Sequence, residues 1–148
     1  MMIIKKILTT STFDVFEKMF FTFLEQTGTG RRQYDSVTAI SFSGPLAGEI
    51  QLHLSDPLAL AMVENMLSVS QHEITREMKE DCAKEAINMI SGEFLRTLDT
   101  TKSFHMGVPV CLPNASVVHE ENPRPDFEQC LNFESEKGGL CIRASLRK

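Results

Sequence analysis

Four segments of the chain alternate apolar and polar residues, which is the pattern of strands that bury one face. Two lie in the first half, at residues 39–43 and 50–55, and two lie near the end, at 127–133 and 140–146. The turn-forming residues 44–48 separate the first two, which predicts a hairpin. A sheet with one apolar face is stable only when a second layer covers that face. The rest of the chain must supply this layer.

Three segments with helical spacing can form the covering layer. The first is predicted from about Ser11, at the start of an S-x-x-D capping pattern, to about Glu25. The second begins at Asp56, followed by a proline that suits a first helical turn, and ends around Ser68. The third and longest spans roughly 75–98.

The remaining strand and the order of elements predict the fold class. Met106–Leu112 is predicted as a strand, and Pro109 within it favours an edge or a bulge. The order is then α-β-β-α-α-β-β-β, an α+β fold in which an antiparallel sheet carries its helices on one face. A length of 148 residues fits a single domain, and we expect residues 1–148 to form one.

Composition excludes several classes of function. The net charge is −5, and no cluster of lysines and arginines is present to hold a phosphate backbone, which argues against nucleic-acid binding. No apolar run approaches a membrane span of roughly 20 residues, and Met1–Leu8 lacks the features of a signal peptide. The cysteines show no C-x-x-C spacing and are interpreted as reduced thiols, so the cytoplasm is the expected location. They are Cys82, Cys111, Cys130 and Cys141.

The polar side of predicted helix 75–98 is the candidate functional face. Its other side forms an apolar stripe, while Asp81, Glu85, Asn88 and Gly92 fall within roughly 60° of one another by helical geometry. Glycine costs about 1 kcal/mol relative to alanine in a helix, and here it leaves bare backbone beside the asparagine. On this spacing alone, an ordinary solvated helix face is the favoured interpretation.

A family resemblance favours the functional interpretation. Lys84–Gly92 resembles the E-x-x-N-x-x-x-G helix of the CheC/CheX/FliY phosphatases. Ser41–Leu52 resembles the hairpin of that family, and residues 56–67 resemble its apolar helix, so the resemblance covers nearly the whole chain. On the first helix, Glu17 is followed three places later by Phe20, so a second motif is missing. A single motif on the later helix is the CheX pattern.

The resemblance implies a protein phosphatase that hydrolyses the aspartyl-phosphate of a CheY-like response regulator, in chemotaxis or related two-component signalling. It implies that Asn88 holds a water in line with phosphorus and that Glu85 pairs with the regulator's active-site lysine. Asp81, Lys84 and Gly92 are expected to contact the partner. Mg²⁺ is expected on the phosphorylated regulator, whereas this chain is expected to bind no metal or cofactor.

Two alternatives remain open at this point. One is a module of the same fold that binds a regulator without useful hydrolysis, and the other is a dimeric scaffold that packs the helix face in an interface. A homodimer is expected in any case, as in CheX relatives, through the edges of strands 127–133 and 140–146.

The chain departs from the family pattern after the glycine of the motif. Gly92 is followed by Glu93, Phe94 and Leu95, which are bulkier than the small and basic residues expected there.

Other candidate sites are interpreted as structural. The four histidines, at 53, 72, 105 and 119, lack metal-ligand spacing, and His53 is expected to be exposed on its strand. Glu64 and Asn65 are adjacent, so they point to different sides of their helix and receive no catalytic role. The methionines at 62, 66, 78 and 89 are interpreted as core residues.

Overall fold

The computed structural model describes residues 2–30, 33–100, 103–113 and 125–147. Its elements are α1 (Met2–Phe20), β1 (Glu25–Thr27), β2 (Ser36–Ser43), β3 (Ala47–Leu54), α2 (Asp56–Leu67), η1 (Gln71–Glu73), α3 (Arg76–Leu98), β4 (His105–Met106), β5 (Val110–Leu112), β6 (Phe127–Glu134) and β7 (Gly139–Arg147). The predicted order of helices and strands is confirmed, with the short β1 and a one-turn 3₁₀ helix added.

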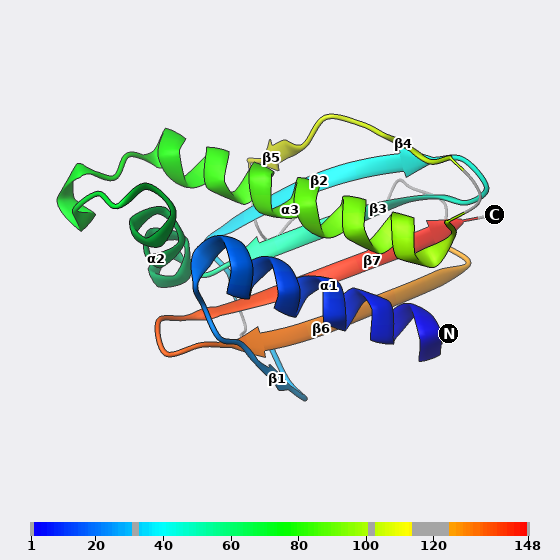
Figure 1. Cartoon of the computed structure of the whole chain (residues 1–148), viewed down its shortest axis with the longest axis horizontal. Helices are drawn as coiled ribbons and strands as arrows, with labels where there is room; N and C mark the ends of the chain where they lie inside the picture. Colours follow the sequence, from blue (N-terminus) through cyan, green and yellow to red (C-terminus); the bar gives the residue numbers. More distant parts are fainter. Residues whose placement is uncertain (1, 31–32, 101–102, 114–124, 148) are drawn as a thin grey trace.

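The strands form an antiparallel sheet with the order β1-β6-β7-β3-β2-β4, and β5 also pairs with β2. The predicted hairpin is present, with Ser36 opposite Leu54 and Ile40 opposite Ile50. Gly44, with a φ of 143°, lies in its turn, a backbone conformation that favours glycine. All three helices lie on the same side of the sheet (Figure 1). The predicted α+β class, with helices on one face, is therefore confirmed.

The core lies between the helices and this face of the sheet. Its largest fully buried side chains include Phe16 and Phe20 of α1, Phe94 of α3 and Phe133 of β6. Burial of each such side chain contributes roughly 1.5–3 kcal/mol to folding. α1 and α3 pack against each other as well as on the sheet, so the exposed face of α3 is held on a rigid base.

The predicted boundaries of the first helix were wrong. The helix begins at Met2, and Ser11 is only 2% exposed in its interior, so this serine cannot act as an N-cap. Ile4 and Leu8 extend the apolar stripe toward the N-terminus, and burial of that stripe outweighs the local capping pattern. The helix also ends at Phe20, before the predicted end near Glu25, and the next residue, Phe21, has a φ of 50°, which is not a helical conformation.

The ends of the sheet partly follow the sequence prediction. Pro109 divides the segment 106–112 into β4 and β5, both paired with β2 at the sheet edge, as predicted. The last strand is not an edge, however, because β7 pairs with β3 on one side and with β6 on the other. The expectation of an exposed edge along 140–146 was therefore wrong. On β6, β1 pairs only with Asn132–Glu134.

Within the described part of the chain, no helix is both long and apolar enough to cross a membrane.

Candidate active site

Helix α3 is the element that places the predicted site residues. Thr75 caps its first turn, since the backbone N–H of Met78 donates to the Thr75 hydroxyl oxygen at 3.1 Å. The inner side buries Ala83, Ala86, Ile87, Ile90 and Phe94 against the sheet and α1. This stripe fixes the rotation of the helix, so the residues on its other side must face outward.

Glu85 and Asn88 lie one turn apart on the outward side of α3. The Glu85 side chain is exposed and Asn88 is half-buried. Within the described residues, neither side chain makes a hydrogen bond or ion pair that would hold it against its own chain. Asp81 is also exposed, and Lys84 is half-buried beside the pair. The structure thus brings the predicted residues onto one accessible face.

Gly92 continues this face one turn after Asn88. A Cβ atom added to Gly92 would meet only the terminal methyl carbon of Met106, at 4.0 Å, which is ordinary van der Waals contact. The chain's own packing therefore does not require glycine here. The bare backbone leaves room for close approach of another surface, and it borders a shallow hollow of about 260 Å³ that Leu95, Arg96 and Phe104 also line.

Exposed methionines flank this face, and the sequence prediction missed them. Met89 is 47% exposed on α3 and Met106 is 41% exposed on β4, while Met66 is 39% exposed on α2. Met89 and Met66 were predicted to be core residues. Of the other two methionines with this prediction, Met62 is fully buried and Met78 is half-buried. Helical geometry could have indicated that Met89 is exposed, because it lies about 40° from Glu85 around the helix. Flexible apolar side chains suit a docking surface.

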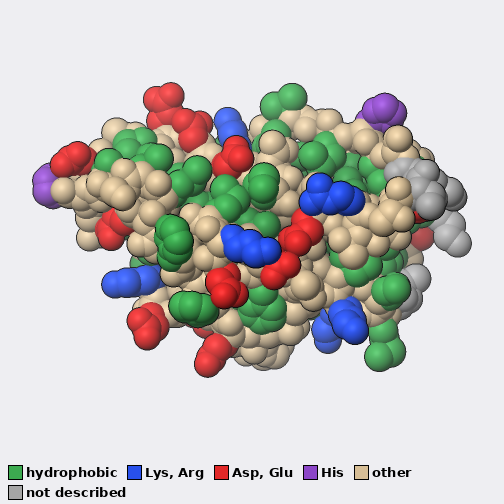
Figure 2. Space-filling model, in the orientation of Figure 1, with side chains coloured by type: hydrophobic (Ala, Val, Ile, Leu, Met, Phe, Trp, Pro, Cys, Tyr) green, Lys and Arg blue, Asp and Glu red, His purple; other side chains and the backbone are tan. Residues whose placement is uncertain are grey.

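The bulky residues after Gly92 do not obstruct the face. Phe94 and Leu95 point into the core. Glu93 turns toward α1, where burial, a hydrogen bond with Asp14 and the negative charge of that residue raise its pKa. Lys18 of α1 also lies close enough to act on Glu93. Figure 2 shows acidic and basic side chains next to each other in the middle of this side of the molecule.

Two other places in the chain, one on α2 and one on α1, were considered for a Glu/Asn pair, and their residues have structural roles. The amide of Asn65 donates to the backbone oxygen of Phe20 at 2.7 Å, so it caps the last turn of α1 and is not available to a substrate. On α1, the position three places after Glu17 is Phe20, a fully buried phenylalanine, so the helix carries no second motif. That Glu64 and Asn65 have no catalytic role stays a prediction.

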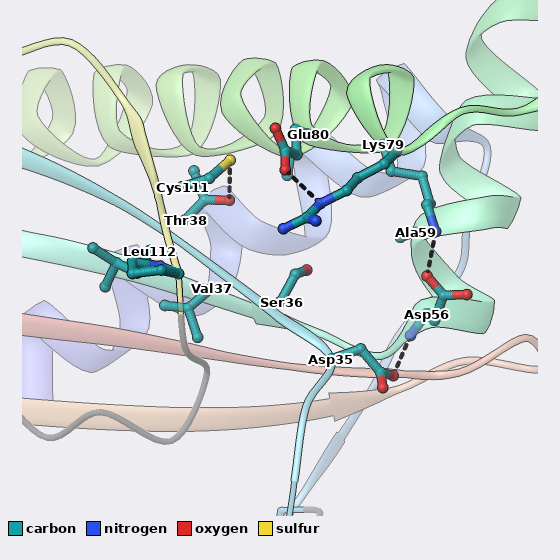
Figure 3. Close-up of a pocket in the computed structure, with 13 residues that line it drawn as sticks. Asp35, Ser36, Val37, Thr38, Asp56, Ala59, Lys79, Glu80, Cys111 and Leu112 are labelled. Atoms are coloured by element: carbon teal, nitrogen blue, oxygen red, sulfur yellow. Dashed lines mark hydrogen bonds and ion pairs between the residues drawn. The ribbon is translucent and has the colours of Figure 1, made fainter.

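A hollow of about 240 Å³ lies on the other side of α3, near its N-terminus (Figure 3). Both of its cations are paired: Lys79 binds Asp56 at 2.7 Å, and Arg76 binds Glu80 at 3.1 Å. At its floor, the hydroxyl of Thr38 lies 3.9 Å from the sulfur of Cys111. The hollow also carries the Asp35 carboxylate, which accepts a hydrogen bond from the Asp56 backbone N–H at 2.6 Å, and Glu85 does not line it.

Among the described residues, no three histidine, cysteine or acidic side chains are grouped so that they could hold a metal ion. His119 lies outside the described residues. His53 points to the face of the sheet opposite the helices, as predicted, but it is half-buried and not exposed. Burial and the charge of Arg143 lower the pKa of His53 to about 4, so its ring is neutral near neutral pH.

Comparison with known protein families shows which family this chain belongs to. Residues 36–129 match the sequence profile of the family described as chemotaxis phosphatase CheX. The chain belongs to the CheX family. The matched residues include the hairpin, α2 and the whole of α3, and they therefore include Glu85 and Asn88. The resemblance found in the sequence is confirmed at the level of the family.

Solved structures with this fold include several CheX proteins. CheX from Vibrio vulnificus has a TM-score of 0.82 at 20% identity, and the match covers 97% of this chain and 96% of that one. CheX from Desulfovibrio desulfuricans has a TM-score of 0.75 at 19% identity, covering 97% and 99%. The CheX–CheY–BeF3–Mg²⁺ complex from Borrelia burgdorferi has a TM-score of 0.75 at 14% identity, covering 97% of each chain. No curated protein sequence matches this CheX-family chain.

Proposed function

We propose that this protein hydrolyses the aspartyl-phosphate of a phosphorylated CheY-like response regulator. The observation that carries the proposal is the pairing of Glu85 and Asn88 on the outward side of α3 in a chain of the CheX family. Both side chains are accessible, and neither is held by another described residue. A docking partner can therefore engage both.

The proposed reaction needs positioning more than covalent chemistry. A water oxygen attacks phosphorus, the bond between phosphorus and the aspartyl oxygen breaks, and the carboxylate leaves. The transition state of phosphoryl transfer is stabilised mainly by charge and by alignment of the nucleophile. Asn88 can do the alignment, because its amide oxygen accepts a hydrogen bond from the water while its NH₂ group donates to the phosphoryl oxygens.

Glu85 supplies the docking contact in this proposal. Its carboxylate is exposed and carries no ion pair within the described residues, so it can pair with the active-site lysine of the regulator. Gly92 lets the partner approach the backbone of α3, while Asp81 and Lys84 border the contact. Mg²⁺ belongs to the regulator, where it neutralises phosphate charge, and this chain contributes no metal ligand.

The Borrelia burgdorferi structure is a complex of CheX with CheY, which supports this class of partner. The identity to that protein is 14%, so the likeness extends to fold and the choice of partner remains part of our proposal. The lack of disulfides among the four cysteines fits a reducing compartment, and we place the protein in the cytoplasm.

The experiment follows decay of phosphorylated regulators from the same genome with this protein added. Faster decay with wild type, and decay at the intrinsic rate with Asn88→Ala, is the expected result. Binding without acceleration by wild type would overturn the phosphatase proposal and leave a non-catalytic regulator-binding module. Absence of binding to any phosphorylated regulator would favour the dimeric scaffold instead.

A further inference from the structure

Cys130 and Cys141 lie side by side on the face of the sheet opposite the helices. They are eleven positions apart in sequence and show no recognisable spacing, but the β6–β7 register brings their Sγ atoms to 2.7 Å. Cys130 is exposed, whereas Cys141 is buried. Adjacent strands hold both residues, so the contact is fixed by the ladder of the sheet.

We propose that Cys130 and Cys141 form a reversible thiol–disulfide site, in which a hydroperoxide oxidises Cys130 and Cys141 resolves the product. This site is independent of the phosphatase proposal, because it lies on the other side of the sheet from α3. A disulfide needs a sulfur–sulfur bond of about 2.05 Å, so the two atoms must approach by only ~0.65 Å. Redox-sensitive cysteines are exposed, acidic and adjacent to a resolving thiol.

The surroundings of Cys130 favour its thiolate. Arg143 lies directly opposite Cys130 in the register, and its Nε atom is buried without a hydrogen-bond partner among the described residues. A thiolate gives that donor a negatively charged neighbour. The hydrogen bond with Cys141 and the charge of Arg143 lower the pKa of Cys130 to about 6, while burial and the Glu128 carboxylate oppose the shift.

Cys141 has the complementary environment. Its hydrogen bond to Cys130 and its burial raise its pKa, so it remains a thiol and donates its hydrogen toward Cys130. His53 stands directly opposite Cys141 on β3, is neutral near pH 7 and adds no charge. The pair therefore divides into an exposed nucleophile and a buried resolving thiol.

The chemistry balances in two steps. The Cys130 thiolate attacks one peroxide oxygen, an S–O bond forms, the O–O bond breaks, and the departing oxygen takes a proton to leave as water or an alcohol. Sulfur is oxidised by two electrons and the peroxide is reduced. The Cys141 sulfur then attacks the sulfenic sulfur, the S–S bond forms, and hydroxide leaves with the Cys141 proton as water. A dithiol reductant reverses the change.

Cys130 is exposed on the outer face of the sheet, close to its edge. An open hollow of about 370 Å³ borders β6 beside β1, and Cys130, Gln129 and Asn132 are among its lining residues. Lys5 of α1 lines the same hollow. A small hydroperoxide can therefore reach the thiolate without opening of the fold.

The test treats the whole protein with hydrogen peroxide at pH 7 and maps thiols by mass spectrometry. Trypsin cuts after Lys137, which separates the two cysteines, so a disulfide joins two peptides and lowers the intact mass by two hydrogens. We expect this intramolecular link in wild type, its reversal by dithiothreitol, and at least 10-fold slower thiol loss in Cys130→Ser. Cys111→Ser, the matched control, should react as wild type does.

Two further variants test the neighbours of Cys130, and Arg143→Gln keeps the proposal falsifiable if Cys141→Ala disturbs folding. In folded Cys141→Ala, dimedone should trap the sulfenic acid on Cys130. Arg143→Gln should raise the pH midpoint of Cys130 alkylation by iodoacetamide above that of wild type. An oxidised product that lacks the 130–141 link, or reaction of Cys130 no faster than that of Cys111, would overturn the proposal. An unchanged alkylation midpoint in Arg143→Gln would contradict the arrangement proposed for the thiolate.

Discussion

Asn88 is half-buried on the outward side of α3, where loss of its side chain opens no core cavity. Asn88→Ala should therefore keep the fold and regulator binding but lose the ability to position water. We expect the acceleration over the intrinsic rate to be lost, a fall on the order of 100-fold, which a misplaced reactant can cause. Stopped-flow or radiolabel decay measures the rate, and circular dichroism checks the fold. Full activity in this variant would remove Asn88 from the mechanism.

Glu85 should act through affinity. Glu85→Ala should weaken regulator binding by about 1 kcal/mol, the upper range for an exposed ion pair, and Glu85→Lys should weaken it further because the new cation repels the regulator's lysine. Higher salt should weaken wild-type binding and have little effect on the alanine variant. Titrations at several ionic strengths test this, with Glu77→Lys as the charge-matched control from the same helix. Equal affinity of Glu85→Lys and wild type would refute the docking role.

At the scale of the helix, a substitution at Gly92 should change stability and regulator affinity in opposite directions. The space around it accepts a Cβ, so Gly92→Ala should stabilise the protein by up to about 1 kcal/mol through helix propensity. The same methyl group should hinder the close approach of a regulator and lower its affinity. Thermal denaturation and binding are measured together, with Thr97→Ala, at an exposed position on α3, as the control. Higher stability with unchanged affinity would show that no partner reaches this backbone.

The contact between α1 and α3 should make stability depend on pH. The pKa of Glu93 is raised above its usual value of 4.5, so the folded state binds this proton more strongly than the unfolded state. Its stabilising contribution is complete below pH 4.5 and is lost as the pH rises through the folded pKa. Glu93→Gln should match wild type near pH 4 and exceed it at pH 7, by on the order of 0.5 kcal/mol for this partly exposed pair.

Denaturant unfolding at both pH values tests the Glu93 prediction. Glu17→Gln removes the same charge from an exposed position on α1 and serves as the control. A constant difference between Glu93→Gln and wild type at pH 4 and pH 7 would contradict the contact with Asp14 as the cause.

At the scale of elements, the sequence predicted best where burial and local signals agree. Helix α3 has both a continuous apolar stripe and a capping residue, Thr75, and its bounds follow the prediction. In α1 the signals conflict, because Ser11 and Asp14 form a capping pattern inside a helix that Ile4 and Leu8 extend toward the N-terminus. Local chemistry proposes helix ends, but packing against the sheet decides them.

At the scale of the molecule, contacts between distant segments escaped the sequence. Strand order is a non-local property, so the alternation along 140–146 could not reveal that β7 lies inside the sheet. The sulfur contact of Cys130 with Cys141 depends on the same register. By contrast, Glu85, Asn88 and Gly92 lie within two turns of one helix, so their common face followed from helical geometry alone.

We still expect a homodimer through the sheet, but only by the edge of β6, because β7 lies inside the sheet. Residues 127–131 of β6 have no strand on their outer side within the described part of the chain, since β1 covers only 132–134. An open edge presents unpaired backbone groups, and two copies related by a two-fold axis can satisfy them. Side chains stand perpendicular to a sheet, so such pairing leaves the thiol of Cys130 on the outer face.

Light scattering across micromolar concentrations measures the state of assembly. The dimer predicts twice the chain mass of 16.7 kDa. Because α3 lies on the face of the sheet and not at this edge, each copy should keep one outward Glu85–Asn88 pair and bind one regulator (Figure 1). A mass near 16.7 kDa at every concentration would refute the dimer. The phosphatase proposal would stand, since it requires only the face of α3.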